Sequence, residues 1–235
     1  MEHTGHQLTG YAAALIVEPL IPHPGPPNAI VAMGFIAVAG IGALLPDMDM
    51  PRATAAKLLG PVTKGLAWLI NKFSIIVFEA TKTSQDRQGR YPGHRLLTHT
   101  ALWGLLLGAG TLAGVSASPA SAWAWWASLA VMVGHFAHLW GDAITLGGIP
   151  FWAPFIKIRD QRWGRVWLVP KPLRFRVGGH REKTRNKAIS RWSWENLGEG
   201  IVTWALAVAV GLLAAATVLA AGHPWWTTAG LFLAS

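Results

Sequence analysis

Histidine and aspartate side chains recur near the ends of apolar segments of this chain, where they could bind metal ions. Four short sequences hold them: GH near the start, LLPDMDMP after one apolar segment, GHRLLTH before the next, and GHFAHLWGD at the end of another. Imidazole and carboxylate together suit zinc, and manganese or iron less readily. The candidate ligands are His6, Asp47, Asp49, His94, His99, His138 and Asp142.

The number and spacing of these ligands favour a shared centre. His138 and Asp142 lie four residues apart, which places them on one face of a helix. Seven ligands exceed what one tetrahedral ion needs, so we expect two or more divalent ions, zinc first and manganese as the alternative. Each feature alone has a plainer explanation: a solvated turn for the aspartates, a local hydrogen bond for His138 with Asp142, and a membrane-surface anchor for His94 with Arg95. These separate explanations become improbable if all the residues lie together at one face of the membrane.

Such a centre could catalyse hydrolysis. A bound divalent ion lowers the pKa of water to about 7, and a second ion could hold a phosphoryl oxygen. Arg95 is positioned in the sequence to bind that oxygen through its forked guanidinium. Asp49 or Asp142 could act as the general base instead of as a ligand. The predicted catalytic residues are therefore Arg95, Asp49 and Asp142.

The composition indicates that this chemistry belongs to a membrane protein. Of 235 residues, 52% are hydrophobic and 13% are charged, whereas soluble domains are about a quarter charged. The 14 tryptophans favour the same conclusion, because tryptophan concentrates at membrane interfaces. The chain has no cysteine, which excludes disulfides, thiolate zinc ligands and cysteine nucleophiles. A soluble globule and a disordered chain are both disfavoured.

Four uncharged stretches are long and apolar enough to be membrane spans, at 29–45, 96–115, 122–140 and 201–221. A fifth stretch, 8–20, is a weaker candidate because it carries Glu18. Four prolines within 21–28 and the short sequence SASPAS supply two of the connections. We therefore expect an all-α fold, a multi-pass transmembrane helical bundle of about five spans that forms one domain over residues 1–235.

The basic residues predict the orientation of this bundle. All 20 lysines and arginines lie between Arg52 and Arg191, in two loops at about 46–95 and 145–198. Basic loops stay in the cytoplasm, so the candidate ligands would fall at the cytoplasmic membrane surface. The second loop contains FIKIRD, RVWLV and LRFRV, which could form a small β-hairpin. Its cations should face anionic phospholipid headgroups.

Two other functions stay open at this point. A structural metal site would join helices without catalysis, and it would close its coordination with protein ligands. A transporter would place such residues near the bilayer midplane, often in repeated halves, whereas here they gather at one surface and no repeat is visible. The expected partners are the bilayer and a small-molecule or lipid substrate. Nucleic acid is not expected, because the basic loops contain no helix–turn–helix or stacking motif.

The four sequences together resemble the YdjM-like family of bacterial, membrane-bound, metal-dependent hydrolases. That family carries GH near its start, LLPDxDxP, GHRxxTH, and HxxxD followed by T, G and P. The chain has these motifs in the same order, spacing and helix-end context over most of residues 5–150. Met50, Ala53 and Leu96 depart from residues that are common in the family, and residues after about 150 are only loosely similar.

The resemblance implies a fold, a ligand set and an activity. The family is similar to the zinc-dependent phospholipase C fold, whose helices hold clustered zinc through His and Asp. Carried over by motif, all seven candidates would be metal ligands, with Arg95 beside the metals and Thr98 behind them. The resemblance also implies a location in the bacterial inner membrane. The expected activity is hydrolysis of a phosphate ester, either a phospholipid or a lipid-linked phosphate, at the cytoplasmic membrane surface.

Overall fold

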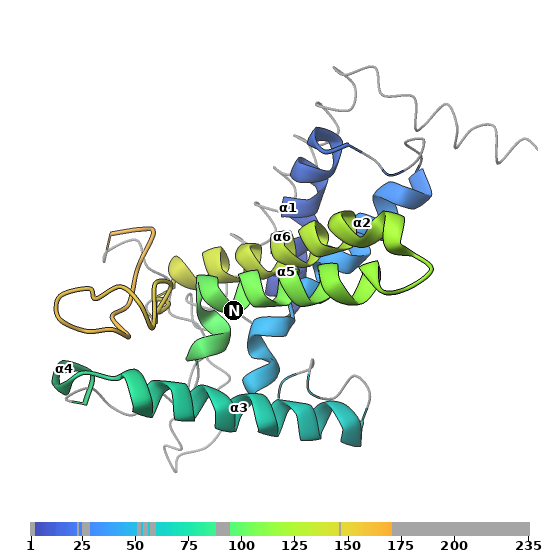
Figure 1. Cartoon of the computed structure of the whole chain (residues 1–235). Helices are drawn as coiled ribbons and strands as arrows, with labels where there is room; N and C mark the ends of the chain where they lie inside the picture. Colours follow the sequence, from blue (N-terminus) through green and yellow to red (C-terminus); the bar gives the residue numbers. More distant parts are fainter. Residues whose placement is uncertain are drawn as a thin grey trace, which may run out of the picture.

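The computed structural model describes residues 3–22, 24, 29–50, 53, 56, 60–87, 95–145 and 147–170 (Figure 1). These residues form six α-helices joined by short 3₁₀ turns, and their β-pairing is limited to isolated bridges. The all-α class predicted from the sequence is therefore confirmed. The predicted span 201–221 and the sequence LRFRV lie outside the described residues.

Four helices form the bundle that carries the candidate site. They are α1 (His3–Val17), α2 (Ala29–Gly42), α5 (Ala101–Ser116) and α6 (Ala124–Ala143). α6 packs against the other three, and α1 also packs against α2 (Figure 1). Their core is built from small residues around Phe35, whose ring meets Trp126 edge-on at a centroid distance of 5.2 Å. The sequences predicted as spans at 8–20, 29–45, 96–115 and 122–140 thus correspond to helices.

Glycine allows α6 to approach α2 closely. A Cβ atom on Gly134 would lie 1.9 Å from the carbonyl oxygen of Ala39, so a larger residue would force the two helices apart. From the other side, a Cβ atom on Gly42 would lie 2.5 Å from the carbonyl oxygen of Val131. This crossing is one helical turn before His138 and therefore determines how near that side chain comes to the end of α2.

The predicted span 96–115 becomes helical later than expected. Its helix, α5, begins at Ala101 because Thr100 is extended and its hydroxyl accepts a hydrogen bond from the backbone N–H of Trp103. The preceding residues form the 3₁₀ turn η4 (Leu97–His99), and all three are buried. His99 therefore belongs to a separate turn and not to the surface of α5.

Fewer of these helices than predicted have the length and apolarity of a membrane span. Within the described residues, the stretch Ile30–Asp49 meets both conditions, and Ala101–Ser116 is a shorter apolar helix. α6 has 20 residues, but His135, His138 and Asp142 lower its hydropathy. The number of about five crossings therefore stays a prediction.

The first basic loop contains a long helix that the sequence did not predict. This helix, α3 (Pro61–Thr81), lies beside η4 and beside the 3₁₀ turn η2 (Leu45–Asp49), which follows α2 (Figure 1). One face of α3 is buried, and its Phe78 packs edge-on against Trp163. Lys64 and Lys72 interrupt the apolar pattern in the sequence, but in the helix they lie on a face of their own.

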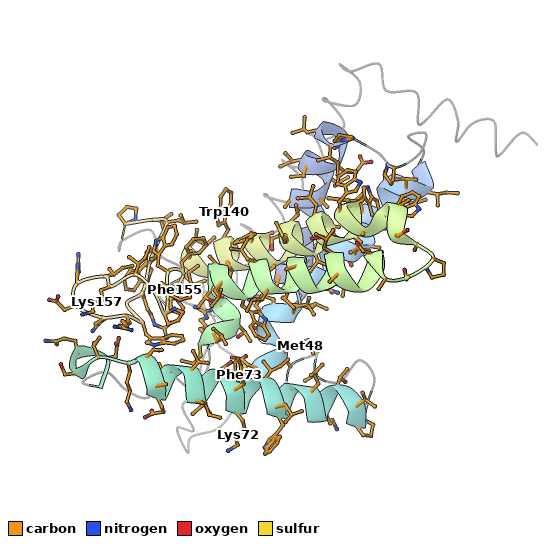
Figure 2. All side chains as sticks on the ribbon, viewed as in Figure 1. Met48, Lys72, Phe73, Trp140, Phe155 and Lys157 are labelled. Atoms are coloured by element: carbon orange, nitrogen blue, oxygen red, sulfur yellow. The ribbon has the colours of Figure 1, made fainter. Side chains whose placement is uncertain are left out.

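An exposed apolar stripe follows another face of α3. Its residues are spaced by three and four positions, as neighbours on one helical face are. They are Val62, Leu66, Leu69, Phe73 and Ile76. Figure 2 shows Lys72 projecting from α3 away from the helical bundle. α3 is therefore amphipathic even on the surface that it leaves exposed.

The described part of the second basic loop is built from turns instead of the predicted hairpin. Residues 147–170 contain no strand, and two isolated antiparallel bridges hold them. Those bridges join Ile149 to Val166 and Ile158 to Gln161. The carboxylate of Asp86, in α4 (Ser84–Arg87), accepts hydrogen bonds from the backbone N–H groups of Arg162 and Trp163. These two hydrogen bonds hold the loop next to the end of α3, without the backbone hydrogen bonds that would join the strands of a hairpin.

Candidate metal centre

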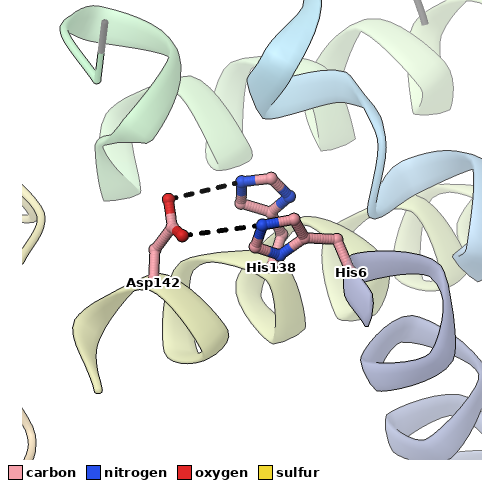
Figure 3. Close-up of side chains that lie close together, drawn as sticks. All are labelled: His6, His138 and Asp142. Carbon is pink, nitrogen blue, oxygen red and sulfur yellow. Dashed lines mark ion pairs between the residues drawn. The ribbon is translucent and has the colours of Figure 1, made fainter. Parts of the chain in front are cut away.

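Five of the predicted ligands come together from four separate segments. α1 supplies His6, η2 supplies Asp47, η4 supplies His99, and α6 supplies His138 and Asp142. All are buried except Asp47, whose side chain is 18% exposed. They form two groups of possible metal ligands that share His138. Within each group the ligand atoms lie within 4.8 Å of one another, and Figure 3 shows the group of His6, His138 and Asp142.

The separations of these atoms match those around a small divalent ion. The Nε2 atoms of His99 and His138 lie 3.3 Å apart, and Oδ2 of Asp142 is 3.4 Å from the first and 3.6 Å from the second. Oδ1 of Asp47 is 3.7 Å from both nitrogens. Ligand atoms about 2.0 Å from a tetrahedral zinc lie about 3.3 Å from one another. The facing atoms of His99, His138 and Asp142 therefore fit an ion of that size after a small contraction, and Asp47 lies almost as close to both nitrogens.

Hydrogen bonds on the far side of the rings orient two of the imidazoles. Nδ1 of His138 lies 2.7 Å from the carbonyl oxygen of Ala43, just beyond the end of α2. Because a carbonyl only accepts, Nδ1 carries the proton and Nε2 presents its lone pair to the centre. Nδ1 of His99 lies 3.1 Å from the hydroxyl oxygen of Thr98. The contact of Thr98 agrees with the position that the resemblance implied for it.

Asp142 faces both groups through different oxygens. Its Oδ1 lies 3.5 Å from Nε2 of His6, whereas its Oδ2 faces His99 and His138. The ring of His6 stacks on that of His138 at a centroid distance of 3.7 Å. His138 cannot ligate two ions, because Nε2 has one lone pair and Nδ1 is bonded to the Ala43 carbonyl. A second ion would therefore depend on His6 and on Oδ1 of Asp142.

Arg95 lies against the centre through Asp142. Its Nη2 donates to Oδ1 of Asp142 at 2.7 Å, and its Nη1 donates to the Thr145 hydroxyl at 3.0 Å and to the Gly148 carbonyl at 3.2 Å. The backbone of Arg95 has φ 69°, a left-handed conformation that costs about 1–2 kcal/mol for a residue other than glycine. Such strain persists where surrounding contacts fix the residue, as these three hydrogen bonds do.

Two other residues of the motifs, Asp49 and His135, are not among the side chains that come together. Asp49 is buried in η2, and neither group of possible ligands contains it. His94 lies outside the described residues. His135 is also outside both groups: its ring packs over Gly104, and its Nε2 lies 3.3 Å from the carbonyl oxygen of Thr100.

Arg165 is a further cation beside the centre that no motif marks. The sequence indicated only that it belongs to a basic loop. Its Nη1 donates to the carbonyl oxygens of Gly147 and Gly148, at 2.8 and 3.0 Å. Burial and the neighbouring Arg95 guanidinium both lower the pKa of Arg165, while Asp142 acts in the opposite direction. Its position depends on how the loop folds back, which local sequence does not reveal.

Comparison with known proteins agrees with the motifs. No curated protein and no solved structure matches the chain. A family model described as YdjM inner membrane protein matches residues 1–223, which include every possible ligand of the centre. The match confirms the family expected from the four sequences and the inner membrane as the location that its description names. The chain therefore belongs to the family of YdjM inner membrane proteins.

Proposed function

We propose that this protein is a metal-dependent hydrolase of phosphate esters that acts at the cytoplasmic surface of the inner membrane. The observation that carries the proposal is the convergence of three imidazoles and two carboxylates from four segments on one small volume. Buried carboxylates and imidazoles are costly without a cation among them, and the separations suit a zinc-sized ion. Zinc is the first candidate and manganese the second.

A partly open side of the centre favours catalysis over a purely structural role. The side chains of Asp47 and Arg95 are partly exposed to solvent, by 18% and 13%. Those of His99, His138 and Asp142 are buried. A catalytic metal keeps a position for water or substrate, and a structural metal does not. We propose that substrate approaches along the side of Asp47 and Arg95.

Each side chain has a role that follows from its contacts. A divalent ion in the centre would supply Lewis acidity and bring the pKa of water to about 7. His99, His138 and Asp142 would hold it, and Asp47, the most accessible carboxylate, would be either a further ligand or the group that accepts a proton from water. Arg95 orients Asp142 and adds positive charge where phosphoryl oxygens would gather.

A structural metal site is the second candidate, and the depth of the ligands favours it. His99 and His138 have no exposed surface, and their contacts join η4, α6 and the end of α2. A buried ion there would stabilise the bundle even without turnover. The two candidates differ in whether a metal-loaded chain hydrolyses anything.

The test measures bound metal and hydrolysis on the same detergent-purified samples. We expect one or two zinc or manganese ions per chain in the wild type and fewer in His99→Ala, together with hydrolysis of a chromogenic phosphodiester or a phospholipid by the wild type and not by this variant. Trp140→Ala is the matched control, because Trp140 lies between two ligands on α6 but is exposed (Figure 2). Metal without any phosphate-ester hydrolysis would favour the structural role, and a metal-free wild type after growth with zinc and manganese would overturn both.

A further inference from the structure

Two guanidinium groups meet at one carbonyl oxygen beside the metal centre. Arg95 and Arg165 both donate from Nη1 to the oxygen of Gly148, at 3.2 and 3.0 Å. They come from segments seventy positions apart in the chain, one before α5 and one after α6. Like charges repel when they are held this close, and partial burial weakens the screening by water. The arrangement therefore needs a reason beyond local hydrogen bonding.

The position of Arg165 is fixed from both sides. Trp163 is buried against Phe78, its indole N–H donates to the Thr81 hydroxyl at 3.0 Å, and its backbone N–H donates to Asp86. On the other side, Val166 exchanges two backbone hydrogen bonds with Ile149, at 2.8 and 3.2 Å. Arg165 is thus held in place beside Arg95, whereas a loop that only met lipid headgroups would need no such anchoring.

Glycine shapes the turn that both arginines contact. Gly148 has φ 58°, in the left-handed region that favours glycine, and a Cβ atom there would lie 2.7 Å from the ring of Trp167. This conformation lets the carbonyl oxygens of Gly147 and Gly148 both face Arg165. The turn therefore contacts both cations through neutral carbonyls, which do not balance their positive charge.

Both guanidiniums keep donors for a ligand. Each guanidinium has five N–H groups. Among the described residues, hydrogen bonds engage three N–H groups of Arg95 and two of Arg165. Asp142 is the one carboxylate that forms an ion pair with either arginine in that part of the chain, and it also faces the histidines. The pair therefore has more positive charge and more donors than its protein partners use.

We propose that Arg95 and Arg165 together form a phosphate-binding subsite next to the metal centre, with Arg165 as the residue that contacts substrate oxygens from the far side. A phosphate group matches two forks, because it offers several oxygens to bidentate guanidiniums while another oxygen faces the metal side. This inference rests on the proposed function for its catalytic meaning, but the binding of phosphate itself does not. The same chemistry is shared by free phosphate and by the phosphate of a lipid headgroup.

The test is calorimetric titration of the full-length, detergent-purified protein with inorganic phosphate, with bound metal measured on each sample. Arg165→Gln should weaken phosphate binding by about tenfold or more, because a charge-assisted bidentate contact is lost. Arg159→Gln, which removes an exposed arginine of the same loop, should bind as the wild type does. Arg165→Lys, which keeps the charge but loses the fork, should lie between the two, and it serves if Arg165→Gln does not fold. A parallel titration with mixed micelles containing phosphatidic acid separates a lipid phosphate from a free one.

Each outcome decides one of the two proposals. The subsite is overturned if the wild type and both Arg165 variants bind phosphate with equal affinity. It is also overturned if the wild type binds neither inorganic phosphate nor phosphatidic acid, even when metal is bound. Binding that depends on Arg165 in a chain without metal supports the subsite and overturns the metal-dependent hydrolase. Binding of phosphatidic acid alone supports the subsite and identifies a lipid phosphate as its ligand.

Discussion

The three histidines of the centre differ in what their outer ring nitrogens contact. Nδ1 of His138 bonds to the Ala43 carbonyl, and Nδ1 of His99 lies against Thr98. Within the described residues, Nδ1 of His6 has no hydrogen-bond partner, although it is buried. Because a partner on the outer nitrogen orients an imidazole and raises its basicity, His6 should be the weakest of the three ligands.

This difference predicts how metal is lost when single histidines are replaced. His138→Ala should remove the ion held with His99 and Asp142, because Nε2 of His138 faces both of those side chains. His6→Ala should remove at most one ion and leave the ion held by His99, His138 and the aspartates. Elemental analysis of the purified variants measures both. A His6→Ala protein without metal, beside a metal-loaded His138→Ala protein, would contradict the assignment.

At the scale of the elements, the centre depends on where helices stop and how closely they cross. α2 ends just before Ala43, whose carbonyl meets His138, and the cap at Thr100 keeps His99 in a turn of its own. The small-residue crossing at Gly134 then brings α6 against α2. A ligand set gathered from four segments needs all three features at once.

The crossing at Gly134 can be tested with one methyl group. Gly134→Ala would put a Cβ atom 1.9 Å from the Ala39 carbonyl oxygen, so α6 must shift. We expect a loss of stability of about 1–3 kcal/mol and weaker metal binding, since His138 moves away from the end of α2. Thermal unfolding and a metal titration measure the two effects. Gly110→Ala in α5, where nothing lies within 4 Å of the added atom, is the control and should lower neither stability nor metal affinity.

The exposed stripe of α3 predicts contact with the bilayer interface. Its apolar side chains lie beside a face that carries Lys64 and Lys72, and this combination is typical of helices that lie in the headgroup region of anionic membranes. The chain has no cysteine, so a single introduced cysteine can carry a polarity-sensitive dye. In nanodiscs, the dye on Leu69→Cys should show a blue-shifted emission, and the dye on Glu79→Cys should not. Equal, water-like emission at both positions would place α3 outside the membrane.

At the scale of the whole molecule, the basic loops and the candidate metal centre lie at the same ends of the apolar helices. The lysines and arginines occupy two loops, and the described part of the second loop folds back onto the centre through Arg165. The hairpin between α5 and α6 carries no charge at all. A chain arranged in this way should insert with both basic loops and the centre in the cytoplasm.

That orientation can be tested with an impermeant thiol reagent on cells expressing single-cysteine variants. Ala117→Cys, at the exposed end of the α5–α6 hairpin, should react in cells whose outer membrane alone has been opened. Lys157→Cys, exposed in the second basic loop, should react only after the inner membrane is also opened (Figure 2). The opposite pattern would move the centre to the periplasmic side.

Local sequence was enough to predict the helical class, the family and most of the side chains that come together as possible metal ligands. Apolar runs fold as helices whatever they later pack against, and His138 with Asp142 share a helical face at any packing. The inner-membrane family could be predicted because its four motifs are present in this chain in the same order. α3 was missed because two lysines interrupt its apolar pattern. The described part of the predicted hairpin is built from turns, to which Asp86 bonds.

Which of the possible ligands meet, and which groups surround them, depends on how the helices and loops pack. The carbonyl of Ala43 orients His138 through backbone geometry that no side-chain pattern records. Arg165 lies beside Arg95 because a loop returns across the end of α6, a contact between residues seventy positions apart. Such contacts depend on helix crossings and loop closure, which involve distant parts of the chain and are therefore absent from local sequence.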